Sequence, residues 1–76
     1  MRNSSRIEKF CQRLARAWEY MPDMRFGQFM MNVLGAYAHE VRDPWFPEED
    51  EMIEYIEKWA KENSPYRKSE ENNGGN

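Results

Sequence analysis

Residues 22–35, which read PDMRFGQFMMNVLG, decide the fold of this 76-residue chain. Pro22 disfavours helical backbone at Met21, so a preceding helix should end there. Asp23 suits the start of the next helix, because its carboxylate can accept backbone N–H bonds and its charge complements the helix dipole. Apolar residues then recur at helical spacings of three and four: Phe26, Phe29, Met30, Val33, Leu34, Tyr37 and Val41. We expect a helix over residues 24–39, the most buried of the protein.

The polar residues of this helix fall on a separate stripe, formed by Arg25, Gln28, Asn32 and His39. The stripe is either the solvated face of a core helix, or its members Arg25, Gln28 and Asn32 form a small recognition strip for a partner. Gly27 and Gly35 each cost about 1 kcal/mol relative to alanine inside a helix. If the stripe is a solvated face, these glycines would let a neighbouring element approach closely.

A first amphipathic helix is predicted over residues 5–21. Ser5 and Glu8 have the spacing of a capping box, which marks a helix start. An unbroken apolar stripe follows, made of Ile7, Phe10, Cys11, Leu14, Trp18 and Met21.

The opposite side of this first helix carries a basic ridge, formed by Arg2, Arg6, Lys9, Arg13 and Arg16. Such a ridge could bind nucleic-acid phosphates, and Arg6, Lys9, Arg13 and Arg16 are the candidate contacts for that function. It could equally be a solvated face, or it could pair with acidic residues elsewhere in the bundle. The net charge of −3 argues against non-specific nucleic-acid binding.

The segment after the central helix contains two prolines, Pro44 and Pro47, which exclude a continuous helix. Trp45 and Phe46 lie between them. Because large apolar side chains are costly to leave in water, we expect this pair to plug the end of the bundle. If one is exposed instead, it becomes the strongest binding anchor of the chain. His39 precedes this segment and has no second catalytic group near it in sequence.

A third helix is predicted over residues 48–63. Four consecutive carboxylates open it, Glu48, Glu49, Asp50 and Glu51, and they complement the positive end of the helix dipole. Its apolar stripe consists of Met52, Ile53, Ile56, Trp59 and Ala60, and Asn63-Ser64-Pro65 ends it. Tyr66 could cover the core. Residues 67–76 are polar and are predicted to be a disordered tail, so the domain spans residues 4–66.

Composition excludes several classes of protein. With one cysteine and one histidine, the chain has neither a disulfide nor the ligand set of a structural metal site. No apolar run reaches the roughly 20 residues of a membrane span. We find no phosphate-binding loop, nucleophile elbow or metal-ligand spacing. The sequence therefore predicts a cytoplasmic protein that is not an enzyme, has no cofactor and has no membrane association.

A wider pattern links the middle of the chain to known sequences. The run Pro22-Asp23-Met24-Arg25-Phe26-Gly27-Gln28-Phe29 is followed by Asn32, by Asp43-Pro44-Trp45-Phe46 and by the acidic helix start. This arrangement resembles small proteins of unassigned function from bacteria and their phages or prophages, which share a PD-x-R-F/L-G-Q turn. The resemblance implies a phage-linked accessory role and carries no known chemistry.

We therefore expect an all-α fold, a compact three-helix mini-bundle whose middle helix lies between two charged helices of opposite sign. The leading functional hypothesis is a non-enzymatic protein-binding module, with a host protein as its partner. Its candidate contacts are Arg25, Gln28 and Asn32, with Trp45 as the anchor. The alternatives are nucleic-acid binding through the first helix, and a homodimer that shares a core containing Met24, Met30 and Met31.

Overall fold

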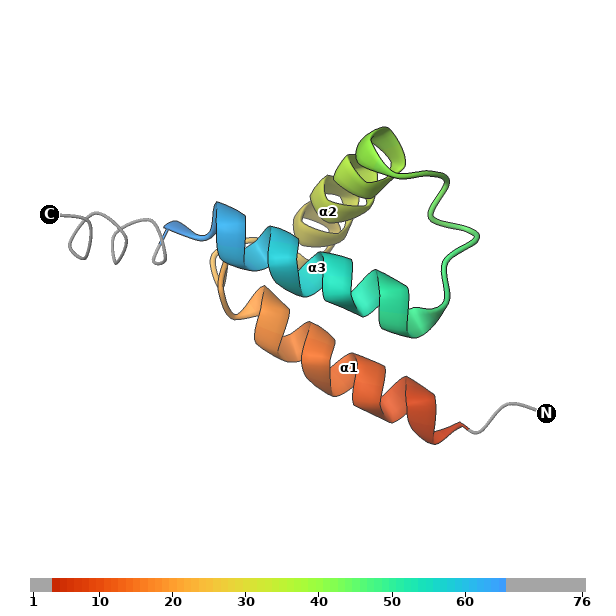
Figure 1. The fold of residues 1–76 in the computed structure, drawn as a ribbon. Helices are drawn as coiled ribbons and strands as arrows, with labels where there is room; N and C mark the ends of the chain where they lie inside the picture. The colour runs from red at the N-terminus through yellow and green to blue at the C-terminus, as the bar shows by residue number, and fades with distance from the viewer. Residues whose placement is uncertain (1–3, 66–76) are drawn as a thin grey trace, which may run out of the picture.

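The computed structural model describes residues 4–65 and confirms the all-α prediction (Figure 1). Three helices form a compact mini-bundle: α1 (Ser5–Trp18), α2 (Phe26–Glu40) and α3 (Glu49–Asn63). The predicted polar tail, Tyr66 and Arg2 lie outside the described residues.

The boundaries differ from the prediction mainly at the α1–α2 turn. α1 ends at Trp18 rather than near Met21, and the residues that follow form tight turns. Asp23 was predicted to cap α2, but the capping position belongs to Arg25, whose backbone is extended (φ −71°, ψ 158°). The Arg25 N–H donates to Gln28 Oε1 at 2.8 Å, which satisfies one of the free donors at this helix start. The glutamine at the third helical position therefore fixes where α2 begins.

The helix that lies between the other two is α3, not α2 (Figure 1). α1 and α3 run side by side in the same direction, because the connection through α2 returns the chain to the end where it began. Two ion pairs show the parallel register: Arg6 Nη1 lies 2.6 Å from Glu49 Oε1, and Arg13 Nη2 lies 2.6 Å from Glu57 Oε1. The prediction that α2 is sandwiched between charged helices was wrong, because α1 and α3 pack directly against each other.

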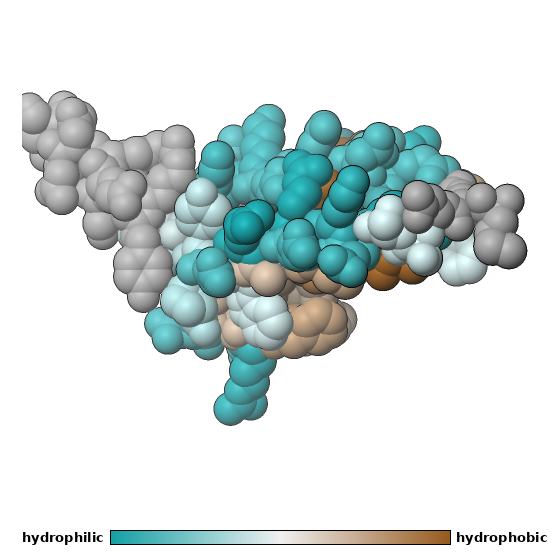
Figure 2. Space-filling view, turned by 90° about the horizontal axis from the view of Figure 1, so that it is seen from below, coloured by the Kyte–Doolittle hydropathy of each residue, from teal (hydrophilic) through white to brown (hydrophobic). Residues whose placement is uncertain are grey.

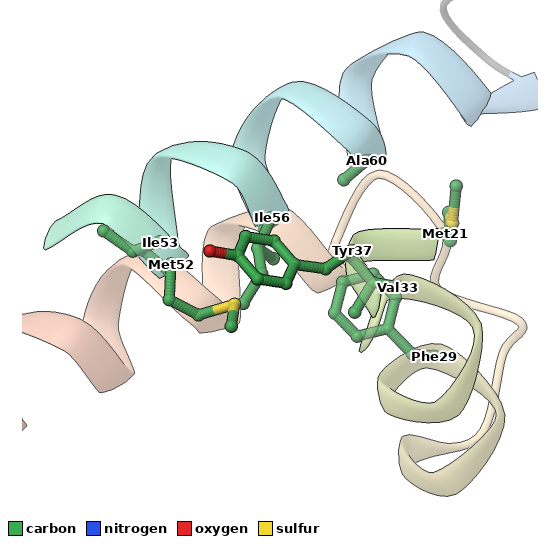
Figure 3. Close-up of a cluster of buried hydrophobic side chains, with 9 residues drawn as sticks. Met21, Phe29, Val33, Tyr37, Met52, Ile53, Ile56 and Ala60 are labelled. Carbon is green, nitrogen blue, oxygen red and sulfur yellow. The ribbon is translucent and has the colours of Figure 1, made fainter. Parts of the chain in front are cut away.

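The core is centred on Phe29, which is fully buried and touches a tryptophan from each of the other helices. Its ring stacks on Trp18 of α1, with 6.2 Å between centroids, and meets Trp59 of α3 edge-on at 5.9 Å. Figure 3 shows the side chains of α2 pointing toward those of α3. The buried apolar residues are Ala17, Met21, Phe29, Val33, Tyr37, Met52, Ile53, Ile56 and Ala60.

Two hydrogen bonds tie the α1–α2 turn to this core. Trp18 Nε1 donates to the carbonyl oxygen of Met24 at 2.8 Å, so the same tryptophan that packs on Phe29 also holds the turn. Ser64, directly after α3, is fully buried and donates through Oγ to the carbonyl oxygen of Tyr20 at 2.7 Å. Both bonds satisfy polar groups that burial would otherwise make costly.

Parts of the predicted apolar faces remain in solvent. Ile7 and Cys11 on the α1 stripe are exposed, because α3 covers only one side of this helix. A Cβ at Gly27 or Gly35 would meet nothing within 4 Å among the described residues, so no neighbour uses the close approach that these glycines allow. Seen from below, on the α1 side, the surface is mostly hydrophilic with an apolar band beside it (Figure 2).

The position of Phe29 predicts a large difference between two phenylalanines of α2. Phe29→Ala should cost about 3–5 kcal/mol, because it removes a fully buried ring between two tryptophans. That loss equals the roughly 3–5 kcal/mol that a core of this size can supply, so the variant should be unfolded in far-UV circular dichroism at 25 °C.

Phe26→Ala is the matched control, because Phe26 lies on the same helix and also touches Trp18 but is 55% exposed. This variant should keep the helical spectrum and a cooperative thermal transition. A folded Phe29→Ala protein, or an unfolded Phe26→Ala protein, would contradict the assignment of the core.

Candidate functional site

The connector between α2 and α3 contains an ordered turn, formed by residues 43–46. The Phe46 N–H donates to the carbonyl oxygen of Asp43 at 3.2 Å, and the Trp45 N–H donates to Asp43 Oδ1 at 2.9 Å. Pro44 occupies the second position of this turn, where its fixed φ angle is favourable. The sequence Asp-Pro-Trp-Phe therefore determines the local geometry, and the connector extends away from the helices (Figure 1).

Both aromatic side chains of this turn are in solvent. Trp45 is 85% exposed and Phe46 is 64% exposed, so the prediction that they plug the end of the bundle was wrong. The end of the core is already filled by Tyr37, Met52 and Ile53, which are all buried. We name residues 43–46 the aromatic turn.

A cluster of three polar side chains joins the two ends of the connector. Glu51, in the first turn of α3, accepts a hydrogen bond from the Tyr37 hydroxyl at 2.6 Å. The same carboxylate accepts from Arg42 Nη2 at 3.0 and 3.3 Å, and Arg42 lies just before the aromatic turn. One carboxylate thus connects the last turn of α2, the start of the connector and the start of α3. We call this cluster the clamp.

A second tyrosine also forms a hydrogen bond between α2 and α3, but here the donor belongs to α3 and the acceptor to α2. Tyr55 of α3 donates to Glu40 Oε1 of α2 at 2.6 Å, and its ring meets Tyr37 edge-on at 5.0 Å. Burial, the hydrogen bond to Glu40 and the negative charges of Glu40 and Glu62 raise the pKa of Tyr55 to about 12. The two tyrosines therefore hold α2 on α3 through reciprocal bonds.

The clamp predicts that Tyr37→Phe lowers the free energy of unfolding by about 1–3 kcal/mol, since a hydrogen bond to an ionised carboxylate is lost. Urea denaturation measures this difference. Tyr20→Phe is the control, because the structure gives the Tyr20 hydroxyl no hydrogen-bond partner among residues 4–65; its effect should stay within about 0.5 kcal/mol. Equal losses in the two variants would rule out the clamp.

The raised pKa of Tyr55 predicts a late ionisation step. Absorbance at 295 nm should show, in the difference between wild type and Tyr55→Phe, a step with a midpoint near pH 12. Because folding raises this pKa, the associated stability should be complete below about pH 10, the usual tyrosine value, and should be lost as the pH approaches the folded value. A midpoint near pH 10 would mean that Tyr55 is fully solvated.

The predicted recognition strip does not join the aromatic turn into one site. Arg25, Gln28 and Asn32 are all exposed near the start of α2. Trp45 follows the end of that helix, whose 15 residues span about 22 Å. The Gln28 side chain is also occupied by capping. These candidates therefore form two separate surfaces.

The basic face of α1 is partly used inside the fold. Arg6 pairs with Glu49, and Arg13 pairs with Glu57 through both its Nε and Nη2 groups, at 2.7 and 2.6 Å. Hydrogen bonding to Arg13 lowers the pKa of Glu57. Lys9 and Arg16 are exposed. Of the four nucleic-acid-binding candidates, two are thus engaged with α3, which is the structural alternative that the sequence left open.

The methionines proposed for a homodimer differ in exposure. Met31 is 79% exposed on the outer side of α2, whereas Met24 and Met30 are partly buried against the core of their own chain. They do not form one continuous exposed surface.

No group of three or more histidine, cysteine, aspartate or glutamate side chains within residues 4–65 is arranged to hold a metal ion. In the same residues, no helix has the length and apolar character that crossing a bilayer requires.

Sequence reasoning identified Trp45 as a conditional anchor but missed the clamp. Tyr37 was assigned only to the core, and neither Arg42 nor Glu51 was singled out as a partner for it. Their pairing depends on how the connector folds back, which the spacing of residues in the sequence does not indicate.

Comparisons with protein-family models, with curated proteins and with solved structures found no match to this chain.

Proposed function

We propose that this protein is a non-enzymatic protein-binding module whose anchor is the aromatic turn. The observation that carries the proposal is the exposure of Trp45 and Phe46, at 85% and 64%, on a turn with a defined backbone. Exposed aromatic pairs are costly in a monomer, and tryptophan is among the residues that most often dominate binding energy at interfaces.

The rigidity of the turn supports the same proposal. Hydrogen bonds to Asp43, the ring of Pro44 and the clamp at Glu51 restrict the connector before any partner arrives. A side chain that is already ordered loses less conformational entropy on binding. The aromatic turn is therefore suited to insert Trp45 into a pocket of another protein.

The resemblance to small phage- and prophage-associated proteins extends the proposal to the kind of partner. It suggests an accessory factor that modulates a host protein, in the reducing interior of a bacterial cell. Nucleic-acid binding through Arg6, Lys9, Arg13 and Arg16 is the weaker alternative, because Arg6 and Arg13 already form ion pairs with α3.

Site-specific photo-crosslinking tests the proposal. Phe46 is replaced by p-benzoylphenylalanine and the protein is irradiated in a lysate of the cells that carry the gene. We expect a discrete adduct of higher mass that falls at least about tenfold when Trp45→Ala is added, because interface tryptophans commonly contribute 2 kcal/mol or more.

The control places the same photoreactive group at Lys58, an exposed position of α3 away from the turn. It should give no such adduct. Trp45→Ala should also leave the free energy of unfolding within about 0.5 kcal/mol of wild type, because this side chain packs little against its own chain. An adduct that is equally strong from position 58, or that survives Trp45→Ala, would overturn the proposal.

A further inference from the structure

The charge around the aromatic turn is strongly one-sided. Residues 41–51 contain one basic residue, Arg42, and five acidic ones: Asp43, Glu48, Glu49, Asp50 and Glu51. Arg42 is held by Glu51, and Arg6 of α1 pairs with Glu49. With Arg6 included, two basic residues stand against five acidic ones, and Lys9 of α1 also lines the surface beside Glu49 and Asp50. The formal charge of these eight residues is −2.

Two of these carboxylates accept hydrogen bonds from backbone N–H groups. Asp43 accepts the Trp45 N–H, and Asp50 accepts the Glu51 N–H at 2.9 Å. Neither forms an ion pair with a basic side chain of residues 4–65. Both are exposed, and Asp43 belongs to the same turn as Trp45 and Phe46.

We infer that the partner presents an apolar pocket rimmed by lysine or arginine, into which the aromatic turn inserts. The inference rests on the proposed function and adds the chemistry of the partner. Apolar area supplies the affinity of an anchor, whereas complementary charge around it selects the partner and speeds encounter. An acidic rim beside Trp45 therefore fits a basic rim on the other protein.

The same charges disfavour the two phosphate-rich partners. A bilayer with anionic lipids carries a negative surface potential, which repels carboxylates that approach with the turn. Nucleic-acid backbones repel them for the same reason. Exposed aromatic residues on a loop would suit either a membrane or a protein, and the sign of the neighbouring charge favours the protein.

The test measures the Phe46 photo-adduct as the rim charges are removed. Asp43→Asn with Asp50→Asn deletes two charges and keeps the oxygen that accepts each backbone N–H. Because both charges are exposed, their removal should raise the protein concentration that gives half-maximal adduct about fivefold, which corresponds to about 1 kcal/mol. Raising NaCl from 50 to 500 mM should weaken the wild type and affect the doubly neutralised variant less.

A matched control removes two charges elsewhere: Glu19→Gln with Glu62→Gln, both exposed and at the far end of the α1–α3 pair. It should leave the half-maximal concentration unchanged. Mass spectrometry of the adduct should find the crosslink on a polypeptide, next to lysine or arginine. Binding to phosphatidylserine vesicles, measured by co-sedimentation, should be undetectable.

The outcomes separate the two proposals. A Trp45-dependent protein adduct that is insensitive to salt and to the Asp43/Asp50 pair would overturn the basic rim and leave protein binding in place. An adduct with lipid or nucleic acid, or vesicle binding that requires Trp45, would overturn both. The absence of any Trp45-dependent adduct would contradict the proposed function itself.

Discussion

The packing of Phe29 between Trp18 and Trp59 is the contact on which the rest of this structure depends, because it is where all three helices meet. A chain of this size has little core to spare, and one buried ring accounts for much of what holds α2 in place. Trp18 contributes twice, since its ring packs on Phe29 and its indole N–H holds the α1–α2 turn. Once this corner is formed, α2 can leave it at a steep angle and touch mainly α3. The remaining contacts then determine where the far end of α2 lies.

At that far end the contacts are polar as well as apolar. Tyr37 and Tyr55 meet through their rings, and each donates to a carboxylate of the opposite helix. A hydrogen bond to an ionised group contributes more stability than a bond between neutral groups. These two bonds therefore help to fix the position of α2 on α3. Between the parallel helices α1 and α3, the polar contacts are ion pairs at matched intervals, Arg6 with Glu49 and Arg13 with Glu57. Part of the charge asymmetry of the sequence is therefore used within the fold, whereas Lys9 and Arg16 remain exposed.

Much of this architecture could be predicted from the spacing of residues. The three helices, their approximate bounds and the core positions Phe29, Val33 and Ile56 follow from periodicity and from proline signals, because these depend on local backbone rules. The order of the helices in space does not, and the middle helix was wrongly placed at the centre. Periodicity reports how apolar a helix is, but α2 is apolar even on faces that have no neighbour. Which helix lies between the others depends on the two connections and on pairs such as Arg13 and Glu57, which are 44 residues apart.

The aromatic turn was predicted wrongly for a related reason. Large apolar residues are usually buried, and only the folded chain shows that the space beneath them is already filled.

The hydrogen bonds of the clamp both stabilise the contact between α2 and α3 and hold the aromatic turn in position. Glu51 accepts from Tyr37, which belongs to the core, and from Arg42, which leads into the turn. Any change that frees this carboxylate loosens the α2–α3 crossing and lets the connector move at the same time. If Trp45 enters a pocket of a partner as proposed, a connector that moves would raise the entropy lost on binding, and affinity would fall although no contact residue had changed. The position of the exposed aromatic pair therefore depends on a set of bonds that begins at Tyr37, and the proposed binding should weaken when the hydrogen bond of the Tyr37 hydroxyl is lost.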